Sequence, residues 1–184
     1  MIMSKPKASE LTPRQRIARN NKKRGSATER ALVRFLNSYN IPAKRVVMSG
    51  ALKKYVEQFA GLSDNLRGDV IIQQSERSKP IRIEVKSRQK LPAYVTNIRR
   101  GKPWLVKEIT HLCYILTADE FLKLCSENIL PDNRLKIGAE KCGALVKWFK
   151  QDDSGIVAMK EYGKQKWYFA VKHNIALKIG GMYK

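Results

Sequence analysis

The stretch RGDVIIQQSERSKPIRIEVKSR, residues 67–88, predicts a β-hairpin with arms at 69–74 and 81–86. The polar segment SERSKP between the arms ends in proline and is typical of a turn. In the second arm, IRIEVK, aliphatic and charged residues alternate, and successive strand side chains point to opposite faces. One face is therefore aliphatic and the other charged, with Glu84 and Lys86 pointing the same way.

Asp69 begins the opposite arm, so the hairpin brings two carboxylates and an amine into one small volume. Two carboxylates can hold Mg²⁺, a hard cation that takes oxygen ligands. Such a metal polarises a phosphate and acidifies a bound water, while a neighbouring ammonium offsets the charge that gathers on the phosphate. The grouping predicts metal-dependent phosphodiester cleavage. The alternative is that Glu84 and Lys86 form an exposed ion pair on the solvated face of a half-buried strand.

Charge is the feature of the composition that restricts function most. The chain has 184 residues, enough for one domain with its own core, and 37 Lys+Arg against 16 Asp+Glu give a formal charge of +21. Such an excess opposes compaction unless something anionic binds, and nucleic acid is the expected partner. An anionic membrane surface is the alternative, although we find no strongly amphipathic basic helix and no apolar run of about 20 residues. The start of the chain lacks the apolar core of a signal peptide, and we expect a cytoplasmic protein with no membrane partner.

Residues 1–25 contain eight basic residues and one acid, Glu10. They offer little that could be buried, so we expect a flexible basic arm that becomes ordered on nucleic acid. A disordered tail without a function is the equally supported alternative. Lys22, Lys23 and Arg24 at the end of this segment are candidate DNA-binding residues.

The clearest predicted helix covers residues 26–40. Its apolar residues recur at helical spacing, at Leu32, Phe35, Leu36 and Tyr39. Ser26 and Glu29 match a capping box at its start, and Pro42 follows its end. Glu29 therefore has two possible roles, as a cap partner or as a carboxylate that faces the metal site.

The rest of the chain predicts further strands and one more helix. We expect strands at 43–51 and 111–116, then a helix at 117–128 with Thr117 and Glu120 as its capping box. The segments GALVKWFK, GIVAMKEY and KWYFAVK predict a meander of three strands, so the C-terminal part is expected to be rich in β-structure. Its aromatic residues are either core or base-stacking residues, and the core is favoured for Trp148, Trp167 and Tyr168.

The three cysteines, Cys113, Cys125 and Cys142, are widely spaced and form no Cys-X-X-Cys pair. A zinc site that also used His111 and His173 would match no ligand spacing that we recognise. Buried thiols outside any disulfide are therefore expected.

Four segments in order, KRGSATERALVRFL, RVVMSGA, GDVII and IRIEVKSR, resemble the PD-(D/E)XK nuclease superfamily. Within it they are most similar to the archaeal-type Holliday junction resolvases, which also occur in phages and viruses. The resemblance covers about residues 22–90. It implies an α/β, restriction-endonuclease-like fold, in which a mixed central β-sheet is flanked by helices. The basic arm at 1–25 would precede one nuclease domain at 26–184, with the motif core at 26–90 and a C-terminal extension of the sheet at 110–184.

The resemblance also implies roles for individual residues. Asp69 and Glu84 would be metal ligands with the Val85 carbonyl as a third, Lys86 would position the attacking water, and Glu29 would assist from the helix. Ser49 would lie in a loop near the scissile strand and Arg24 at the DNA backbone. The full set of candidate DNA-binding residues is Lys22, Lys23, Arg24, Ser49 and Arg88.

The implied activity is that of a Mg²⁺-dependent, structure-selective endonuclease, with Mn²⁺ as a substitute. It would act as a homodimer and resolve four-way DNA junctions by paired cuts, in recombination and repair, in a prokaryotic or virus-infected cell. Two alternatives stay open: another nuclease of this superfamily (restriction, repair or branched-DNA nicking), and a basic nucleic-acid-binding protein without catalysis. The clustered carboxylates disfavour the second alternative, because they repel the phosphate backbone unless a cation intervenes.

Overall fold

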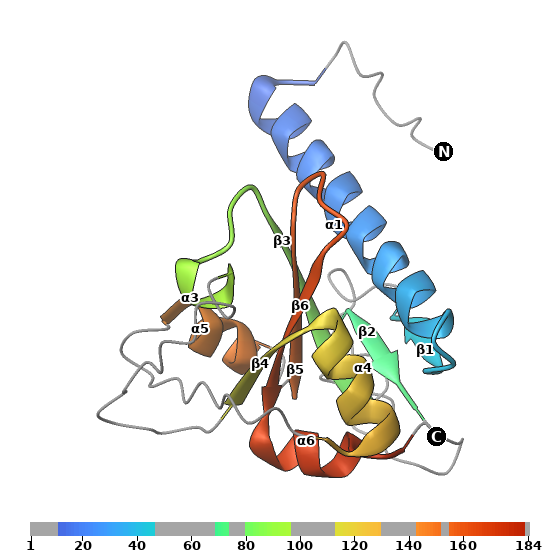
Figure 1. Ribbon diagram of the computed structural model, residues 1–184. Helices are drawn as coiled ribbons and strands as arrows, with labels where there is room; N and C mark the ends of the chain where they lie inside the picture. Colours follow the sequence, from blue (N-terminus) through green and yellow to red (C-terminus); the bar gives the residue numbers. More distant parts are fainter. Residues whose placement is uncertain are drawn as a thin grey trace, which may run out of the picture.

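The predicted hairpin lies inside a six-stranded mixed sheet in the computed structural model (Figure 1). The structure describes residues 11–46, 69–73, 80–96, 113–129, 143–151 and 155–182. Helices flank the sheet, so the fold is α/β. The elements in chain order are α1 (Pro13–Asn37), β1 (Ala43–Arg45), β2 (Val70–Ile72), β3 (Ile81–Arg88), α3 (Ala93–Thr96), β4 (Cys113–Thr117), α4 (Ala118–Glu127), α5 (Gly143–Gln151), β5 (Ile156–Glu161), β6 (Trp167–Lys172) and α6 (His173–Ile179).

The strands lie in the order β1-β2-β3-β5-β6-β4. β1, β2 and β3 pair antiparallel, with Val70 opposite Ile83, so the predicted hairpin is confirmed. β5 runs parallel to β3, with Val157 opposite Glu84, and β6 pairs antiparallel with both β5 and β4. β3 therefore lies between β2 and β5, and it joins β1 and β2 to the C-terminal strands.

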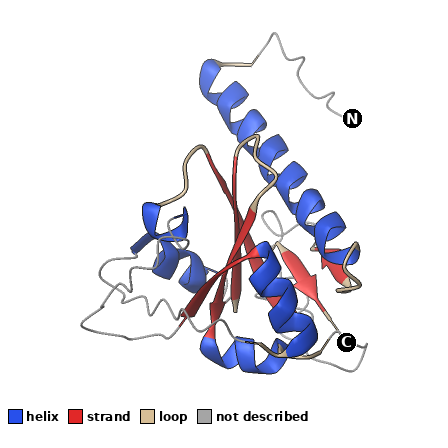
Figure 2. Cartoon of the chain, viewed as in Figure 1, coloured by secondary structure: helices blue, strands red, loops and turns tan. Residues whose placement is uncertain are grey.

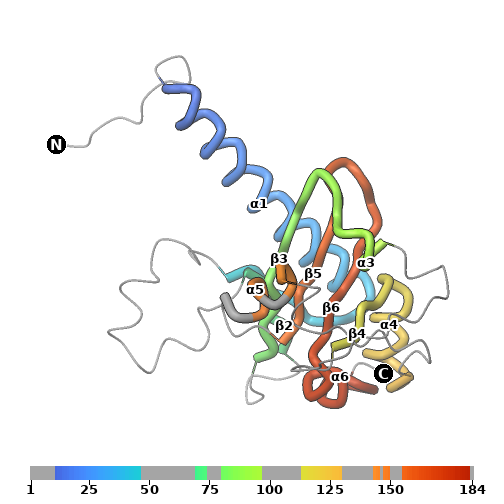
Figure 3. Tube along the Cα trace, turned by 90° about the vertical axis from the view of Figure 1, so that its left-hand side faces the viewer, coloured from blue at the N-terminus to red at the C-terminus, as the bar shows by residue number. Residues whose placement is uncertain are grey.

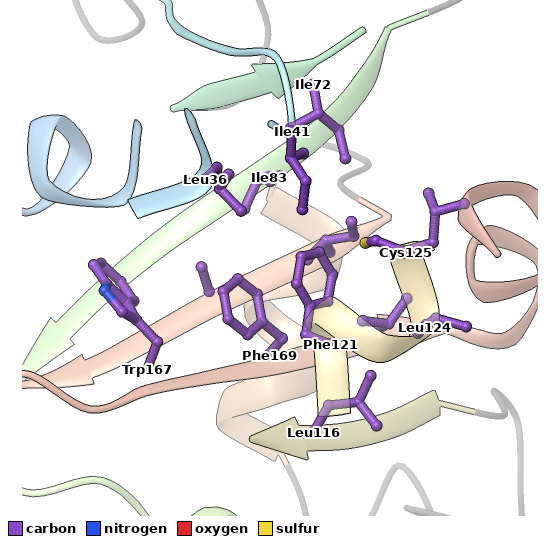
Figure 4. Packing of buried hydrophobic residues seen from close by; sticks show 14 of the residues in the cluster. Leu36, Ile41, Ile72, Ile83, Leu116, Phe121, Leu124, Cys125, Trp167 and Phe169 are labelled. Atoms are coloured by element: carbon purple, nitrogen blue, oxygen red, sulfur yellow. The ribbon is translucent and has the colours of Figure 1, made fainter. Parts of the chain in front are cut away.

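Helices cover both faces of the sheet. α1, α4 and α6 pack on one face, where Ile83, Phe121 and Phe169 belong to one buried cluster (Figures 1 and 4). α3 and α5 pack on the other face, where Val95 and Trp148 belong to a second cluster. The alternation of strand side chains explains the division. β6 supplies Trp167, Phe169 and Val171 to the first cluster and Tyr168 and Ala170 to the second.

α1 is longer than the sequence predicts. It begins at Pro13, where Thr12 and Gln15 form the capping box, and not at Ser26. The predicted capping box of Ser26 and Glu29 is therefore wrong, and residues 13–25 of the expected flexible arm are helical. The first half of α1 contributes no buried residue and projects beyond the sheet in both views (Figures 1 and 3).

The C-terminal predictions are confirmed in part. α4 has the predicted capping box of Thr117 and Glu120, and β4, β5 and β6 lie where strands are expected. The prediction of a strand at GALVKWFK is wrong, because this segment forms α5 (Figure 2). In place of the expected three-stranded meander, β5 and β6 form a two-stranded hairpin. Leu145, Trp148 and Phe149 are spaced three and four residues apart, so one helical face buries all three. α6 adds a helix that the sequence analysis does not predict.

Candidate functional site

Asp69 lies immediately before β2, and its backbone is hydrogen-bonded to β3 on one side and to the residue that follows β1 on the other. Its backbone N–H donates to the Ile83 carbonyl (3.2 Å), and its own carbonyl accepts from the N–H of Val46 (3.0 Å). Its side-chain Oδ2 accepts a hydrogen bond of 2.8 Å from the N–H of Val85. The carboxylate is therefore fixed against β3, at the residue between Glu84 and Lys86.

Glu84 and Lys86 point to the same side of β3, as the alternation predicts. Lys86 Nζ forms an ion pair with Glu84 Oε1. This side is not solvated: Glu84 is 3% exposed, and the Lys86 side chain is 18% exposed. The alternative of an exposed ion pair on a solvated face is therefore wrong, because α3 and α5 cover this face of the sheet.

These contacts place Asp69, Glu84 and Lys86 around three consecutive residues of β3. The N–H and C=O of a residue in a strand point to the same side, since an antiparallel partner exchanges both hydrogen bonds with it. The Val85 carbonyl therefore faces the side from which Asp69 binds the Val85 N–H. Two carboxylates and a carbonyl are the donor types that Mg²⁺ prefers. In the described part of the chain, this site included, no group of three or more His, Cys, Asp or Glu residues gathers as a metal site, and the candidate set here has only two carboxylates beside the carbonyl.

Glu29 lies in the interior of α1, and its carboxylate pairs with Arg45 of β1. Arg45 is opposite Val70 in the sheet, and Val70 is the residue that follows Asp69. α1 packs against Ile83, on the face opposite Glu84. Glu29 and Arg45 therefore lie on the α1 face of the sheet, opposite the Glu84 side, and Glu29 caps neither end of α1.

Two of the candidate DNA-binding residues meet at the β5–β6 turn. The Arg24 guanidinium carbon lies 5.3 Å from the centroid of the exposed Tyr162 ring, and the Tyr162 N–H donates to the Arg88 carbonyl (2.8 Å). The Arg88 guanidinium itself lies over Trp148. Lys22 and Lys23 are exposed on the projecting half of α1. Ser49 lies outside the described residues.

Glu161 and Arg45 are residues that the sequence analysis does not single out. Glu161 is 7% exposed, forms an ion pair with Lys164 and accepts a hydrogen bond of 3.0 Å from the Leu91 N–H. These two contacts, the Lys164 contact first, lower the pKa of Glu161 below its ordinary value. The i,i+3 spacing of Glu161 and Lys164 across the Tyr162–Gly163 turn is the one sequence signal that could have indicated this pair.

The aromatic residues of the C-terminal part belong to the core, as favoured. Trp148, Trp167 and Tyr168 are each less than a tenth exposed. Their rings pack inside the two clusters on either face of the sheet, so they are not a stacking platform for bases.

Cys113 and Cys125 are buried thiols, as expected, and burial raises the pKa of Cys125 to about 12. His173 Nδ1 is 2.6 Å from the Tyr114 hydroxyl. Cys142 and His111 lie outside the described residues, so the expectation for them is untested. Among the helices of the described ranges, none is long and apolar enough to cross a membrane.

Comparisons with protein-family models, with curated proteins and with solved structures find no match to this chain.

Proposed function

We propose that the chain is a Mg²⁺-dependent DNA endonuclease of the Holliday junction resolvase type. The observation that supports this best is the hydrogen bond from the Val85 N–H to Asp69, which holds one carboxylate beside the Glu84–Lys86 pair. A purely structural hairpin does not need two acids and an amine at one point. The buried position of Glu84 adds to this argument, because burying a carboxylate costs free energy unless it is compensated.

In this proposal Asp69, Glu84 and the Val85 carbonyl hold the metal, and Lys86 orients the attacking water. When bound, Mg²⁺ would polarise the scissile phosphate and lower the pKa of a water. The Lys86 ammonium would offset negative charge that develops on the phosphate. Glu29 would assist from α1, where it pairs with Arg45 of β1.

A four-way junction offers two symmetry-related phosphates, and a twofold homodimer would supply two sites at a fixed spacing. The formal charge of +21 per chain supports a substrate with many phosphates. A nuclease of the same superfamily that acts on another DNA structure would use the same residues in the same roles.

A basic DNA-binding protein without catalysis is the second candidate, and one observation favours it. Asp69 and Glu84 both have partners within the fold, the Val85 N–H and Lys86, so both acids could serve stability alone.

One experiment separates these functions. A labelled synthetic four-way junction and a linear duplex with the same arm sequences are incubated with the protein in Mg²⁺, in Mn²⁺ and in EDTA. Paired cuts in the junction alone, dependent on metal, are expected. Cutting of both substrates would indicate another nuclease, and binding of the junction without any cutting would indicate the non-catalytic protein.

A further inference from the structure

Five cations form a line along the outer side of α1, which we call the basic ridge. Successive members are three, four, seven and four residues apart, the spacing that places helix residues on one side. The members are Arg16, Arg19, Lys23, Arg30 and Arg34. All five are exposed, and the line runs about 27 Å along the helix axis at 1.5 Å per residue.

The basic ridge points away from the core. The buried residues of α1 are Leu32 and Leu36, which pack against the sheet. Arg30 and Arg34 each lie two residues from Leu32, about 200° around a helix of 3.6 residues per turn. The ridge therefore faces outward along the whole helix, including the half that projects beyond the sheet (Figures 1 and 3).

No acid balances the ridge within α1. Its one acidic residue, Glu29, is turned toward β1, where it pairs with Arg45. Like charges at i,i+4, such as Arg19 with Lys23 and Arg30 with Arg34, destabilise a helix by a few tenths of a kcal/mol per pair. A straight row of mutually repelling cations is stabilised when a row of anions lies against it.

We infer that the basic ridge binds the phosphate backbone of double-stranded DNA. A stiff duplex matches a straight row of cations, since DNA stays straight over lengths far greater than about 27 Å. Proteins that bind single strands combine cations with aromatic side chains for stacking, and the ridge has none. A helix that lies on a membrane presents an apolar face to the lipid, but the apolar face of α1 is buried against the sheet.

This surface is separate from the candidate active site. α1 covers the face of the sheet lined by Ile83, whereas Glu84 points to the opposite face. A duplex on the ridge is therefore a different DNA segment, or a different part of a branched DNA, from one that lies at Asp69. The inference does not rest on the proposed cleavage, because binding along the ridge requires no metal and no chemistry.

The test compares two variants that each lose four positive charges. The ridge variant is Arg19→Gln, Lys23→Gln, Arg30→Gln and Arg34→Gln. The control variant changes exposed lysines on other elements, Lys44→Gln, Lys123→Gln, Lys147→Gln and Lys178→Gln. Dissociation constants for a linear duplex are measured in EDTA from 50 to 300 mM salt, with thermal unfolding as the check on folding.

The ridge variant is expected to bind on the order of 100-fold more weakly at 100 mM salt, with a log–log salt slope that is smaller by up to about 3.6. The control variant is expected to keep most of the affinity and the slope. A third variant, Arg19→Lys, Arg30→Lys and Arg34→Lys, keeps the charge and is expected to bind as the natural protein does. If the ridge variant does not fold, this charge-preserving variant still tests whether charge on the ridge is sufficient for binding.

Equal losses in the ridge and control variants would overturn the inference, because they would show an effect of net charge alone. Preferential binding of the ridge to a single-stranded oligonucleotide, to duplex RNA or to phosphatidylserine vesicles would overturn it as well. Failure of DNA cleavage with normal duplex binding would contradict the proposed nuclease and leave the ridge intact.

Discussion

At the scale of single residues, three charged side chains of the β2–β3 hairpin, Asp69, Glu84 and Lys86, lie around Val85, and Glu84 is buried. Glu84, Lys86 and Asp69 can be placed together because strand alternation and a short hairpin act over neighbouring residues. Glu84 is buried on the face of the sheet that α3 and α5, later in the chain, cover. The charged face of this strand, which the alternative interpretation placed in solvent, is therefore covered in the fold.

The pairing of Glu29 with Arg45 can be measured by a double-mutant cycle. We expect Glu29→Gln and Arg45→Gln to show a coupling of about 0.5–1 kcal/mol in the free energy of unfolding, because the pair is only partly exposed. The measurement is urea unfolding of the two single variants and the double variant. A coupling close to zero would show that the ion pair does not stabilise the fold.

Glu161 gives a prediction for the dependence of stability on pH. Its pKa is lowered in the folded protein, chiefly by Lys164, so the folded state favours the ionised carboxylate. The stabilisation is present above the ordinary pKa of 4.5 and is lost as the pH falls through the lower pKa of the folded state. Glu161→Gln should therefore lower the melting temperature at pH 7, and the difference from the natural protein should shrink toward pH 3. A difference that is constant from pH 7 to pH 3 would contradict this role.

At the scale of elements, local signals decide which predictions succeed. α4 is predicted correctly because Thr117 and Glu120 mark its start and apolar residues follow at helical spacing. The start of α1 is missed because its first half buries nothing, so only Thr12, Pro13 and Gln15 indicate it. The apolar segment GALVKWFK is too short for its periodicity to distinguish a strand from a helix. In the fold it is the helix α5, and its buried residues pack over the sheet.

The two capping boxes allow a matched comparison. Thr117→Ala should lower the free energy of unfolding by about 1 kcal/mol, since α4 packs into the core and needs its cap. Thr12→Ala removes the same contact from the projecting half of α1, which buries nothing. It should leave the melting temperature unchanged and speed amide hydrogen exchange at residues 16–20. Equal losses of global stability in both variants would show that the first half of α1 packs against the body.

At the scale of the whole molecule, the pairing of β3 with β5 brings distant residues together. Ile83 lies opposite Ile156 in a parallel pair, and nothing in the local sequence marks that partner. Parallel pairing needs a long crossover, which here includes α3, β4, α4 and α5. Strand alternation and helical spacing indicate which side chains share a face, but the joining of the β1–β3 strands to the C-terminal strands depends on this pairing.

The measurement that tests the central claim most directly compares cleavage with binding in three variants. Asp69→Asn and Glu84→Gln keep size and shape but remove the charge that would hold Mg²⁺, and Lys86→Ala removes the ammonium. Asp119→Asn, an exposed acid on α4, is the matched control. Junction cleavage is measured in Mg²⁺ and junction affinity in EDTA, with thermal unfolding to confirm that each variant is folded.

We predict that Asp69→Asn, Glu84→Gln and Lys86→Ala each lower the cleavage rate by at least about 100-fold. Junction affinity should stay the same or rise slightly for the first two, because an anionic group that faces the phosphates is gone, and it should fall slightly for Lys86→Ala. Asp119→Asn should cleave at the natural rate. Cleavage at a near-normal rate by folded Asp69→Asn or Glu84→Gln protein would show that the active site lies elsewhere in the chain.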